Sequence, residues 1–150
     1  MARGNRVVAR LVNGAMIKGT TQDFFPRRPV FHVTLEGSEL VVEVRARLLK
    51  AVFFVRELAG DTSRRDVRGF LAAPGETSHG KKLAVRFKDG ELLCGYSLTF
   101  SPDREGFFMF PSDGGTNNLR VYVLTAATAE IKAGPAADAL ARRILGQEAA

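Results

Sequence analysis

The sequence contains no tryptophan, a single cysteine (Cys94) and only two histidines, His32 and His79. One thiol cannot form an intramolecular disulfide framework, and so few cysteines and histidines cannot supply the ligands of a structural zinc site. No apolar stretch approaches the roughly 20 residues that a membrane-spanning helix needs, and the first residues do not form the apolar core of a signal peptide. We therefore expect a soluble, cytoplasmic protein without metal or cofactor.

Positive charge is concentrated in the first third of the chain. Residues 1–57 contain ten Lys and Arg against five Asp and Glu, whereas all 150 residues contain 22 against 16. A local excess of this kind attracts acidic protein surfaces or polyanions such as nucleic acid. The basic residues are dispersed along the segment instead of forming a run, so they predict a charged face and not a basic tail.

The strongest signal is an internal repeat at an offset of 76 residues. Of the 27 positions from 7 to 33, seven are identical, without a gap, to their counterparts in 83–109. The identical pairs are Arg10/Arg86, Gly14/Gly90, Gly19/Gly95, Phe24/Phe100, Pro26/Pro102, Arg28/Arg104 and Phe31/Phe107. Glycines, a proline and aromatic residues in one shared order predict two copies of the same structural unit.

Each copy has the pattern of five short strands, because apolar and polar residues alternate between turn residues. The expected strands are 7–12, 15–24, 30–35, 40–47 and 50–56 in the first copy, and 83–88, 91–100, 106–110, 119–124 and 127–132 in the second. Asn13-Gly14 and Asp89-Gly90 predict tight hairpin turns with both residues at positive φ. Gly19 and Gly95 stand within strands, where glycine is typical of a sharp bend or bulge.

Five short, bent strands per copy predict a mainly β protein with two tandem five-stranded barrels of the Sm-like or SH3-like type. The expected organisation is a first barrel at 1–57, a linker at 58–80 with a helical turn near 63–71, a second barrel at 81–133 and a C-terminal helix at 134–150. Apolar residues at helical spacing make this helix amphipathic. We expect it to cover a barrel mouth or the groove between the barrels, with partner binding as the alternative.

The stretches 10–19 and 86–95 both read Arg-apolar-x-(Asn/Asp)-Gly followed by apolar residues and a second glycine. This pattern resembles the first Sm motif, and the resemblance implies a small barrel. It does not extend to the RNA site, because Phe25 and Pro29 in the first copy, and Ser101 and Glu105 in the second, stand where Sm proteins have Asp and Asn.

Longer strings occur at 49–56, 87–91, 106–108 and 117–123. They resemble a bacterial domain family of unknown function in which the same strings occur in tandem. That resemblance implies an architecture and a bacterial source, and it implies no activity.

Two nucleotide-binding patterns are incomplete. The segment 75–82 resembles a P-loop, but Lys82 stands where the loop needs Ser or Thr, and a strand follows instead of a helix. Arg64-x-x-x-Arg68 ahead of a barrel resembles the paired arginines of the PilZ domain, which binds cyclic-di-GMP, although the segment 99–106 lacks the acidic residue of the PilZ pattern. Arg64 and Arg68 are therefore weak candidates for a nucleotide site, and we assign them no other role.

No set of residues predicts catalysis. His32 aligns with Phe108 of the second copy, which favours a packing or surface position, and Cys94 aligns with Lys18, which favours an outward position over a nucleophile. The sequence also offers no pair of carboxyl groups in contrasting environments. We therefore predict that the protein is not an enzyme.

The predicted function is that of a non-catalytic adaptor that recognises an acidic protein partner through a basic barrel face. The candidate binding residues are Arg10, Lys18, Arg27, Arg28, Arg45, Arg47 and Arg104. Arginine side chains bind acidic groups through charge-assisted hydrogen bonds. The alternative is RNA or single-stranded nucleic acid, since aromatic residues accompany the arginines, and the third hypothesis is cyclic-di-GMP sensing.

Overall fold

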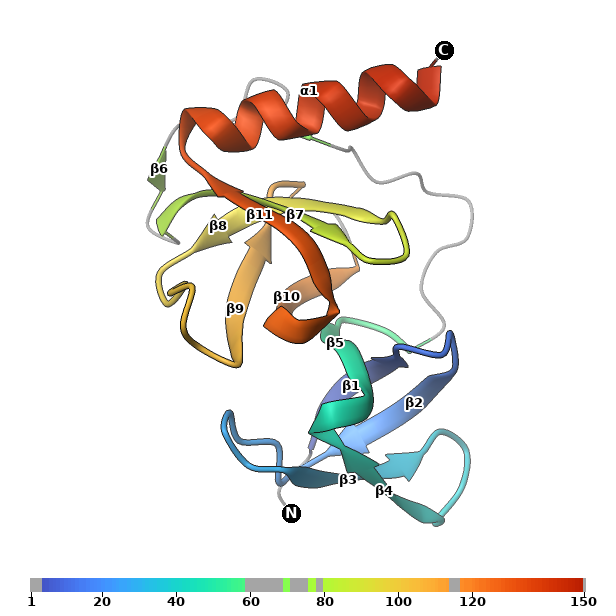
Figure 1. The fold of residues 1–150 in the computed structure, drawn as a ribbon. Coiled ribbons are helices and arrows are strands. Elements are labelled where there is room, and N and C mark those ends of the chain that lie inside the picture. Colours follow the sequence, from blue (N-terminus) through green and yellow to red (C-terminus); the bar gives the residue numbers. More distant parts are fainter. Residues whose placement is uncertain (1–3, 59–68, 71–75, 78–79, 114–116, 150) are drawn as a thin grey trace.

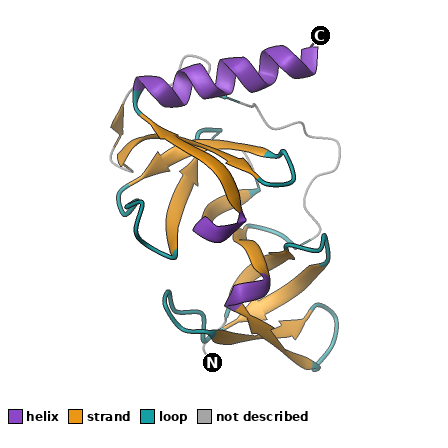
Figure 2. Ribbon diagram, viewed as in Figure 1, coloured by secondary structure: helices purple, strands orange, loops and turns teal. Residues whose placement is uncertain are grey.

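The computed structural model describes residues 4–58, 69–70, 76–77, 80–113 and 117–149 (Figure 1). Its strands are β1 (Asn5–Leu11), β2 (Met16–Thr21), β3 (Val30–Leu35), β4 (Val41–Arg45), β5 (Leu49–Val55), β6 (Glu76–Thr77), β7 (Gly80–Phe87), β8 (Leu92–Ser97), β9 (Gly106–Pro111), β10 (Asn118–Leu124) and β11 (Thr128–Ala133). Two 3₁₀ helices, η1 (Ala46–Leu48) and η2 (Thr125–Ala127), and one α-helix, α1 (Pro135–Ala149), complete the elements. The protein is therefore mainly β, with one C-terminal helix (Figure 2).

The strands form one antiparallel, hydrogen-bonded path in the order β11-β7-β8-β9-β10-β5-β1-β2-β3-β4, with β6 beside β7. Within it, the first strand set (β1–β5) has the order β5-β1-β2-β3-β4, and the second strand set (β7–β11) has the order β11-β7-β8-β9-β10. A 3₁₀ helix joins the fourth strand to the fifth in each set, which Figure 2 shows at corresponding places. Short hairpins connect β1 to β2, β3 to β4 and β7 to β8, as antiparallel pairing allows.

The two strand sets also share their pairing register. Val7 pairs with Gly19 in the first set, and Leu83 pairs with Gly95 in the second, so both partners differ by 76. The fifth strand of each set is irregular at the same place, where it meets the end of the first strand. The offset that relates the sequence motifs therefore also relates the strand pairs.

Two hydrophobic cores lie on opposite faces of a wall made by β5 and β10. Every residue of β5 is buried. On β5, Phe53 packs into the second core with Phe87 and Phe107, whereas Phe54 packs into the first core with Phe31. The strand β10 alternates in the same way, and both of its faces are apolar because each of them lines a core.

The sequence predicted two separate closed barrels, but the strand order in the described part of the chain shows one continuous path of paired strands that is not closed. Within the described residues, no pairing joins β4 to β5 or β10 to β11, and β5 pairs with β10 of the other set, for example Val52 with Tyr122. The physical reason is the composition of β5, which is apolar on both faces and therefore needs cover on both. The second strand set provides that cover.

The hairpin turns at 11–15 and 87–91 differ from the predicted type. Gly14 and Gly90 have φ of 93° and 96°, but among the described non-glycine residues only Arg27 has positive φ, so the prediction for Asn13 and Asp89 is wrong. In each hairpin the glycine N–H donates to the carbonyl oxygen three residues earlier. This is a type I turn closed by a left-handed glycine, which needs only one residue at positive φ.

Gly19 and Gly95 allow close approach between strands. A Cβ on Gly19 would lie 1.9 Å from the carbonyl oxygen of Thr34, and one on Gly95 would lie 2.2 Å from that of Phe110. Both neighbours belong to the third strand of their set, so each glycine lets the third strand cross directly over the second. No larger residue fits there without displacing backbone.

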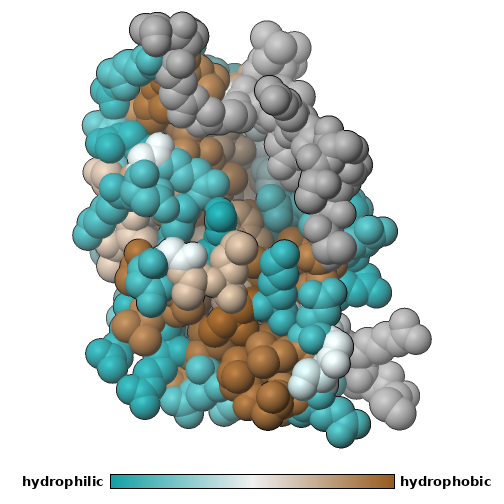
Figure 3. Space-filling model, turned by 90° about the vertical axis from the view of Figure 1, so that its right-hand side faces the viewer, coloured by the Kyte–Doolittle hydropathy of each residue, from teal (hydrophilic) through white to brown (hydrophobic). Residues whose placement is uncertain are grey.

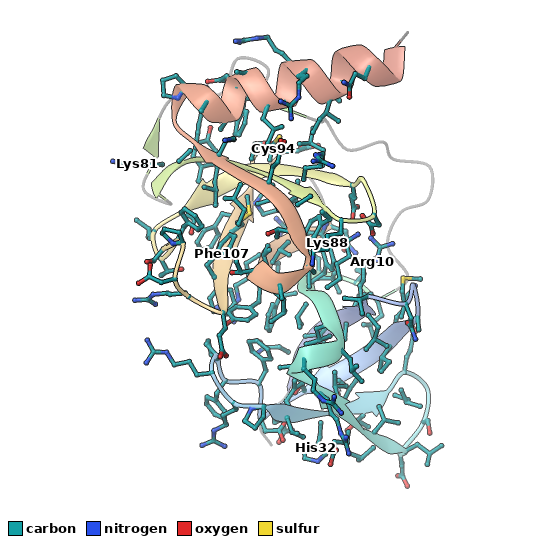
Figure 4. All side chains as sticks on the ribbon, in the orientation of Figure 1. Arg10, His32, Lys81, Lys88, Cys94 and Phe107 are labelled. Atoms are coloured by element: carbon teal, nitrogen blue, oxygen red, sulfur yellow. The ribbon has the colours of Figure 1, made fainter. Side chains whose placement is uncertain are left out.

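Helix α1 covers the outer face of the second strand set. Its Leu140 and Ile144 pack against Leu92 and Cys94 of β8, and its Asp138 accepts a hydrogen bond from Lys82 Nζ at 3.0 Å. Figure 4 shows Cys94 directly beneath the helix. The side chain expected to point outward is thus buried, because the helix covers the surface to which it points. The helical turn expected near 63–71 lies almost wholly outside the described residues.

Among the helices of the described part of the chain, none has both the length and the apolar character needed to cross a membrane.

Candidate functional site

A groove of about 670 Å³ lies between the two strand sets. Four exposed arginines form its rim, namely Arg27, Arg28, Arg45 and Arg47. Its floor consists of buried or half-buried side chains from both sets, namely Phe24, Leu49, Tyr122 and Leu124. We call this surface the arginine groove. It brings together four of the seven residues that the sequence analysis selected for partner binding.

The turn at 25–28 positions two of the four arginines. The Arg28 N–H donates to the carbonyl oxygen of Phe25 at 3.2 Å, and Arg27 has φ of 76°. Proline followed by a residue at positive φ defines a type II turn, whose third position normally holds glycine. Arg27 therefore occupies a strained position at the rim of the groove, and strain of this kind is concentrated at functional sites.

Strand β4 and helix η1 position the other two arginines. Arg45 is the last residue of β4, and Arg47 lies in η1, which turns the chain toward the buried Leu49. The N–H of Ala46 donates to the carbonyl oxygen of Pro29 at 2.8 Å. This hydrogen bond ties η1 to the turn at 25–28, so both pairs of arginines are anchored to the same corner of the sheet.

Much of the positive charge on the rim is not neutralised. Arg45 Nε lies 3.2 Å from Glu43 Oε1. In the part of the chain that the structure describes, no carboxylate lies within ion-pair distance of Arg27, Arg28 or Arg47, and Glu105 is the one acidic residue among those that line the groove. Four arginines against one glutamate leave the groove strongly cationic, which favours an anionic occupant.

Aromatic rings support the floor. The ring of Phe24 makes edge contacts with Phe31, Phe54 and Tyr122, at centroid distances of 5.0, 5.5 and 5.2 Å. Edge-to-face packing of this kind holds rings rigidly. Phe25 differs because it is 49% exposed, and the guanidinium of Arg28 lies 4.6 Å from its ring centroid. The floor is thus a preformed apolar surface, and Phe25 is its exposed aromatic edge.

Burial raises the pKa of the Tyr122 hydroxyl, and the nearby Glu105 raises it further, while Arg27 and Arg104 act in the opposite direction. The hydroxyl therefore stays protonated at neutral pH. Arg104 does not line the groove, although its neighbour Glu105 does. The Arg104 carbonyl oxygen accepts a hydrogen bond from Thr125 Oγ1 at 2.8 Å, which holds its loop against η2.

Arg10 and Lys18 lie on a different surface. They line a shallow hollow of about 230 Å³ together with Val8, Met16 and Glu91. Arg10 Nη1 lies 3.4 Å from Glu91 Oε1, so this arginine already has an acidic partner within the chain. The basic face that the sequence analysis predicted is thus divided between two surfaces, and the larger share belongs to the arginine groove.

Of the remaining candidate residues, some lie outside the part of the chain that the structure describes and one lies on the surface. Arg64, Arg68 and His79 lie outside the described residues. His32 is a surface residue on β3, and its Nδ1 lies 2.7 Å from Asp23 Oδ2. Burial acts to raise the pKa of Asp23, but hydrogen bonds from the His32 side chain, the His32 backbone and Thr21 outweigh it and lower this pKa. Figure 4 shows His32 far from Cys94.

Sequence reasoning missed Tyr122, Glu105 and Leu124, which the second strand set contributes to the groove. The repeat placed them in a separate barrel, so no local pattern linked them to the arginines of the first copy. The signal that could have found them is the apolar run 51–55 of β5, which requires a second layer of strands beside the first set.

The arrangement combines an apolar floor with arginines at its edge. An apolar floor with a few charged groups at its edge is typical of a recognition site. Arginine guanidinium groups bind carboxylates with paired, geometrically specific hydrogen bonds. The groove can therefore hold a segment that combines carboxylates with apolar side chains.

Comparison with family models gives a match over most of the chain. A model described as "Family of unknown function (DUF6982)" matches residues 3–133, which is most of the 150-residue sequence. The chain therefore belongs to this family. A search of the curated proteins found no match, and a search of the solved structures found none.

Proposed function

We propose that this member of the family is a non-catalytic adaptor that binds an acidic segment of a partner protein in the arginine groove. The observation that carries the proposal is the set of four rim arginines above an apolar floor, of which three have no carboxylate partner among the described residues. We further propose that the two strand sets are duplicated units derived from the small-barrel class, joined through β5 and β10. Their shared strand order and the 3₁₀ helix before each fifth strand support this relation.

The composition of the floor favours a peptide over nucleic acid. Recognition of single strands depends on exposed aromatic faces onto which bases stack. Most rings beneath the groove are buried and already packed edge-on against one another. Phe25 is the exposed exception, and Arg28 covers one of its faces. A peptide with carboxylates and aliphatic side chains matches both the charge of the rim and the shape of the floor.

A second candidate, RNA or single-stranded DNA, is favoured by one specific feature, the Arg28–Phe25 pair. A guanidinium stacked on an exposed ring is a surface on which a base can continue the stack. This function would use the same arginines. It predicts a steep fall of affinity with salt, because each neutralised phosphate releases counterions.

The test uses three fluorescent probes on the full chain: a short peptide of alternating Glu and Leu, a thymidine oligonucleotide and cyclic-di-GMP. Anisotropy titrations compare the parent protein with Arg28→Glu and Arg47→Glu. Arg142→Glu, an exposed residue of α1 remote from the groove lining, is the matched control for net charge. We expect the peptide to bind, at least about tenfold weaker binding in both groove variants, and parental binding in the control.

Peptide binding that falls equally in the control variant would mean that net charge alone attracts the probe, and this would refute a defined site. Tighter binding of the oligonucleotide than of the peptide, with a steep salt dependence, would replace the proposal by the nucleic-acid function. Saturable binding of cyclic-di-GMP that is lost on Arg64→Ala and Arg68→Ala would support the third hypothesis instead.

A further inference from the structure

Strand β4 ends the sheet, although its counterpart in the second strand set does not. Val44 pairs with Phe31 as Val123 pairs with Phe107, so β4 and β10 occupy equivalent places. Strand β10 is paired on both sides, by β9 and by β5. Among the described strands, β4 pairs with β3 alone. The outer edge of β10 is thus covered by a further strand, β5, whereas the equivalent edge of β4 has no further strand among the described residues.

The backbone of β4 presents hydrogen-bonding groups on its outer side. The Leu35 N–H donates to the carbonyl oxygen of Leu40, and the Ala46 N–H donates to that of Pro29. Bonded pairs alternate along an antiparallel ladder, so Val42 and Val44 exchange hydrogen bonds with β3. The N–H and C=O groups of Val41, Glu43 and Arg45 therefore point away from β3 and can pair with a further strand.

Apolar side chains accompany this edge. Leu40, the residue before β4, is 65% exposed, and Val41, the first residue of β4, is 57% exposed. Figure 3 views the molecule from the side on which β4 lies in Figure 1, and hydrophobic side chains gather over the lower part of that face, where the first strand set lies. Clustered apolar surface next to an open edge is typical of an interaction site.

A second copy of this chain is a poor occupant for the edge. The equivalent junction would pair β4 with β11 of another molecule, as β10 pairs with β5. In that register Glu130 would lie opposite Val44, and Lys132 would lie opposite Val42. Val44 is 1% exposed and faces the first core. The junction would therefore bring the Glu130 carboxylate, which pairs with Arg86 and Arg143 in its own chain, against an apolar surface. In β5 the corresponding residues are Ala51 and Phe53, which are apolar.

We propose that β4 is the docking edge for an extended segment of the partner protein, which adds to the sheet antiparallel to β4. Side chains opposite Val42 and Val44 must be apolar, as those of β5 are opposite β10. The side chain opposite Arg45 must be acidic. Because the added strand is antiparallel, residues that precede this acid continue past Ala46 and Arg47 into the arginine groove. The segment recognised is therefore an acidic run followed by a strand with apolar residues at alternate positions.

This inference rests on the proposed function, since the groove holds the acidic run, but it concerns a separate contact. Strand addition uses backbone hydrogen bonds for affinity and alternate side chains for specificity, and it is a common mode of peptide recognition. The groove alone would bind acidic peptides of any conformation. The edge requires an extended one with free backbone groups.

The experiment compares two synthetic peptides on the full chain by anisotropy. The short probe is Glu-Glu-Leu-Glu, and the long probe continues it with Val-Thr-Phe-Thr, which places Val and Phe opposite Val44 and Val42. The decisive variant is Glu43→Pro, because proline removes an N–H that points to the free edge and leaves the hydrogen bonds to β3 intact. Glu43→Ala is its matched control, since it removes the same carboxylate and keeps the N–H.

We expect the long probe to bind the parent protein at least about tenfold more tightly than the short one. That gain should disappear in Glu43→Pro and persist in Glu43→Ala, with the short probe equal in both. Equal binding of the two probes to the parent, or an unchanged gain in Glu43→Pro, overturns the docking edge and leaves the groove standing. Failure of the short probe, with the long probe still sensitive to Glu43→Pro, overturns the groove instead. Self-association of the parent that Glu43→Pro abolishes would identify a second copy as the occupant and refute the proposal.

Discussion

The residue Arg27 provides a direct test of the balance between stability and binding. A non-glycine residue held in the left-handed region costs about 1–3 kcal/mol, and Arg27 has φ of 76° in a turn whose geometry favours glycine. Glycine at this position would remove the strain but would lose more entropy on folding, by about 0.5–1 kcal/mol. Arg27→Gly should therefore raise the free energy of unfolding by about 1 kcal/mol.

For a chain of this length, 1 kcal/mol corresponds to a rise in Tm of about 2–4 °C. Urea unfolding followed by circular dichroism, together with thermal melts, measures both quantities. The second strand set supplies the control, because Asp103 occupies the same position in the turn closed by the Arg104 N–H and the Ser101 carbonyl oxygen, and it does not have positive φ. Asp103→Gly relieves no strain and loses a hydrogen bond from Ser101 Oγ, so it should destabilise the protein.

The same Arg27→Gly variant should bind the acidic probe more weakly, because it loses one of the cationic groups on the rim of the groove. Stability would then rise while affinity falls, which is the behaviour expected of strain retained for function. A variant that is less stable than the parent would refute the reasoning about strain. A variant with higher stability and undiminished binding would show that the strained residue has no role in the groove.

Three further changes test the fold. Gly19→Ala should destabilise by about 1–3 kcal/mol or more, since its Cβ would lie 1.9 Å from the carbonyl oxygen of Thr34. Gly146→Ala in α1 should stabilise the protein by up to about 1 kcal/mol, because the added Cβ meets nothing within 4 Å. Urea unfolding measures both variants, and a change of the same sign in the free energy of unfolding of Gly19→Ala and Gly146→Ala would contradict this. A hydrogen bond from Lys50 lowers the pKa of Asp89 below its ordinary value of 3.8, so the stabilisation by Asp89 should be complete above that pH and lost as the pH falls through the lowered pKa. Asp89→Asn should therefore be less stable than the parent at neutral pH and equal to it in strong acid, and a difference that is constant with pH would argue against the ion pair.

Local patterns were sufficient to predict much of the secondary structure. The alternation in 7–12 and 83–88 corresponds to β1 and β7, and the helical spacing after Gly134 corresponds to α1. Gly14 and Gly90 are the left-handed residues of their turns, although their neighbours are not. These features depend on residues close together in sequence, which interact through backbone geometry alone.

The assembly of the site was predictable only in part. Arg27, Arg28, Arg45 and Arg47 do converge, because the strand pattern of one copy is enough to bring β4 and the turn at 25–28 to one corner. Arg10 lies apart from this group, and its ion-pair partner Glu91 comes from the second strand set. Long-range pairing of that kind leaves no periodic trace in the sequence around Arg10.

By itself, the sequence determined most of the strands, the positions of the hairpin turns, the offset of 76 between the matching segments 7–33 and 83–109, and the excess of positive charge in residues 1–57. Tertiary structure alone decided that β5 and β10 pair, that their wall divides two cores, and that β4 is left as an open edge beside the arginine groove. The physical reason is that β5 and β10 are far apart in the chain and pair because the pairing buries both of their faces. Burial is a property of the assembled sheet, so neither segment shows it alone.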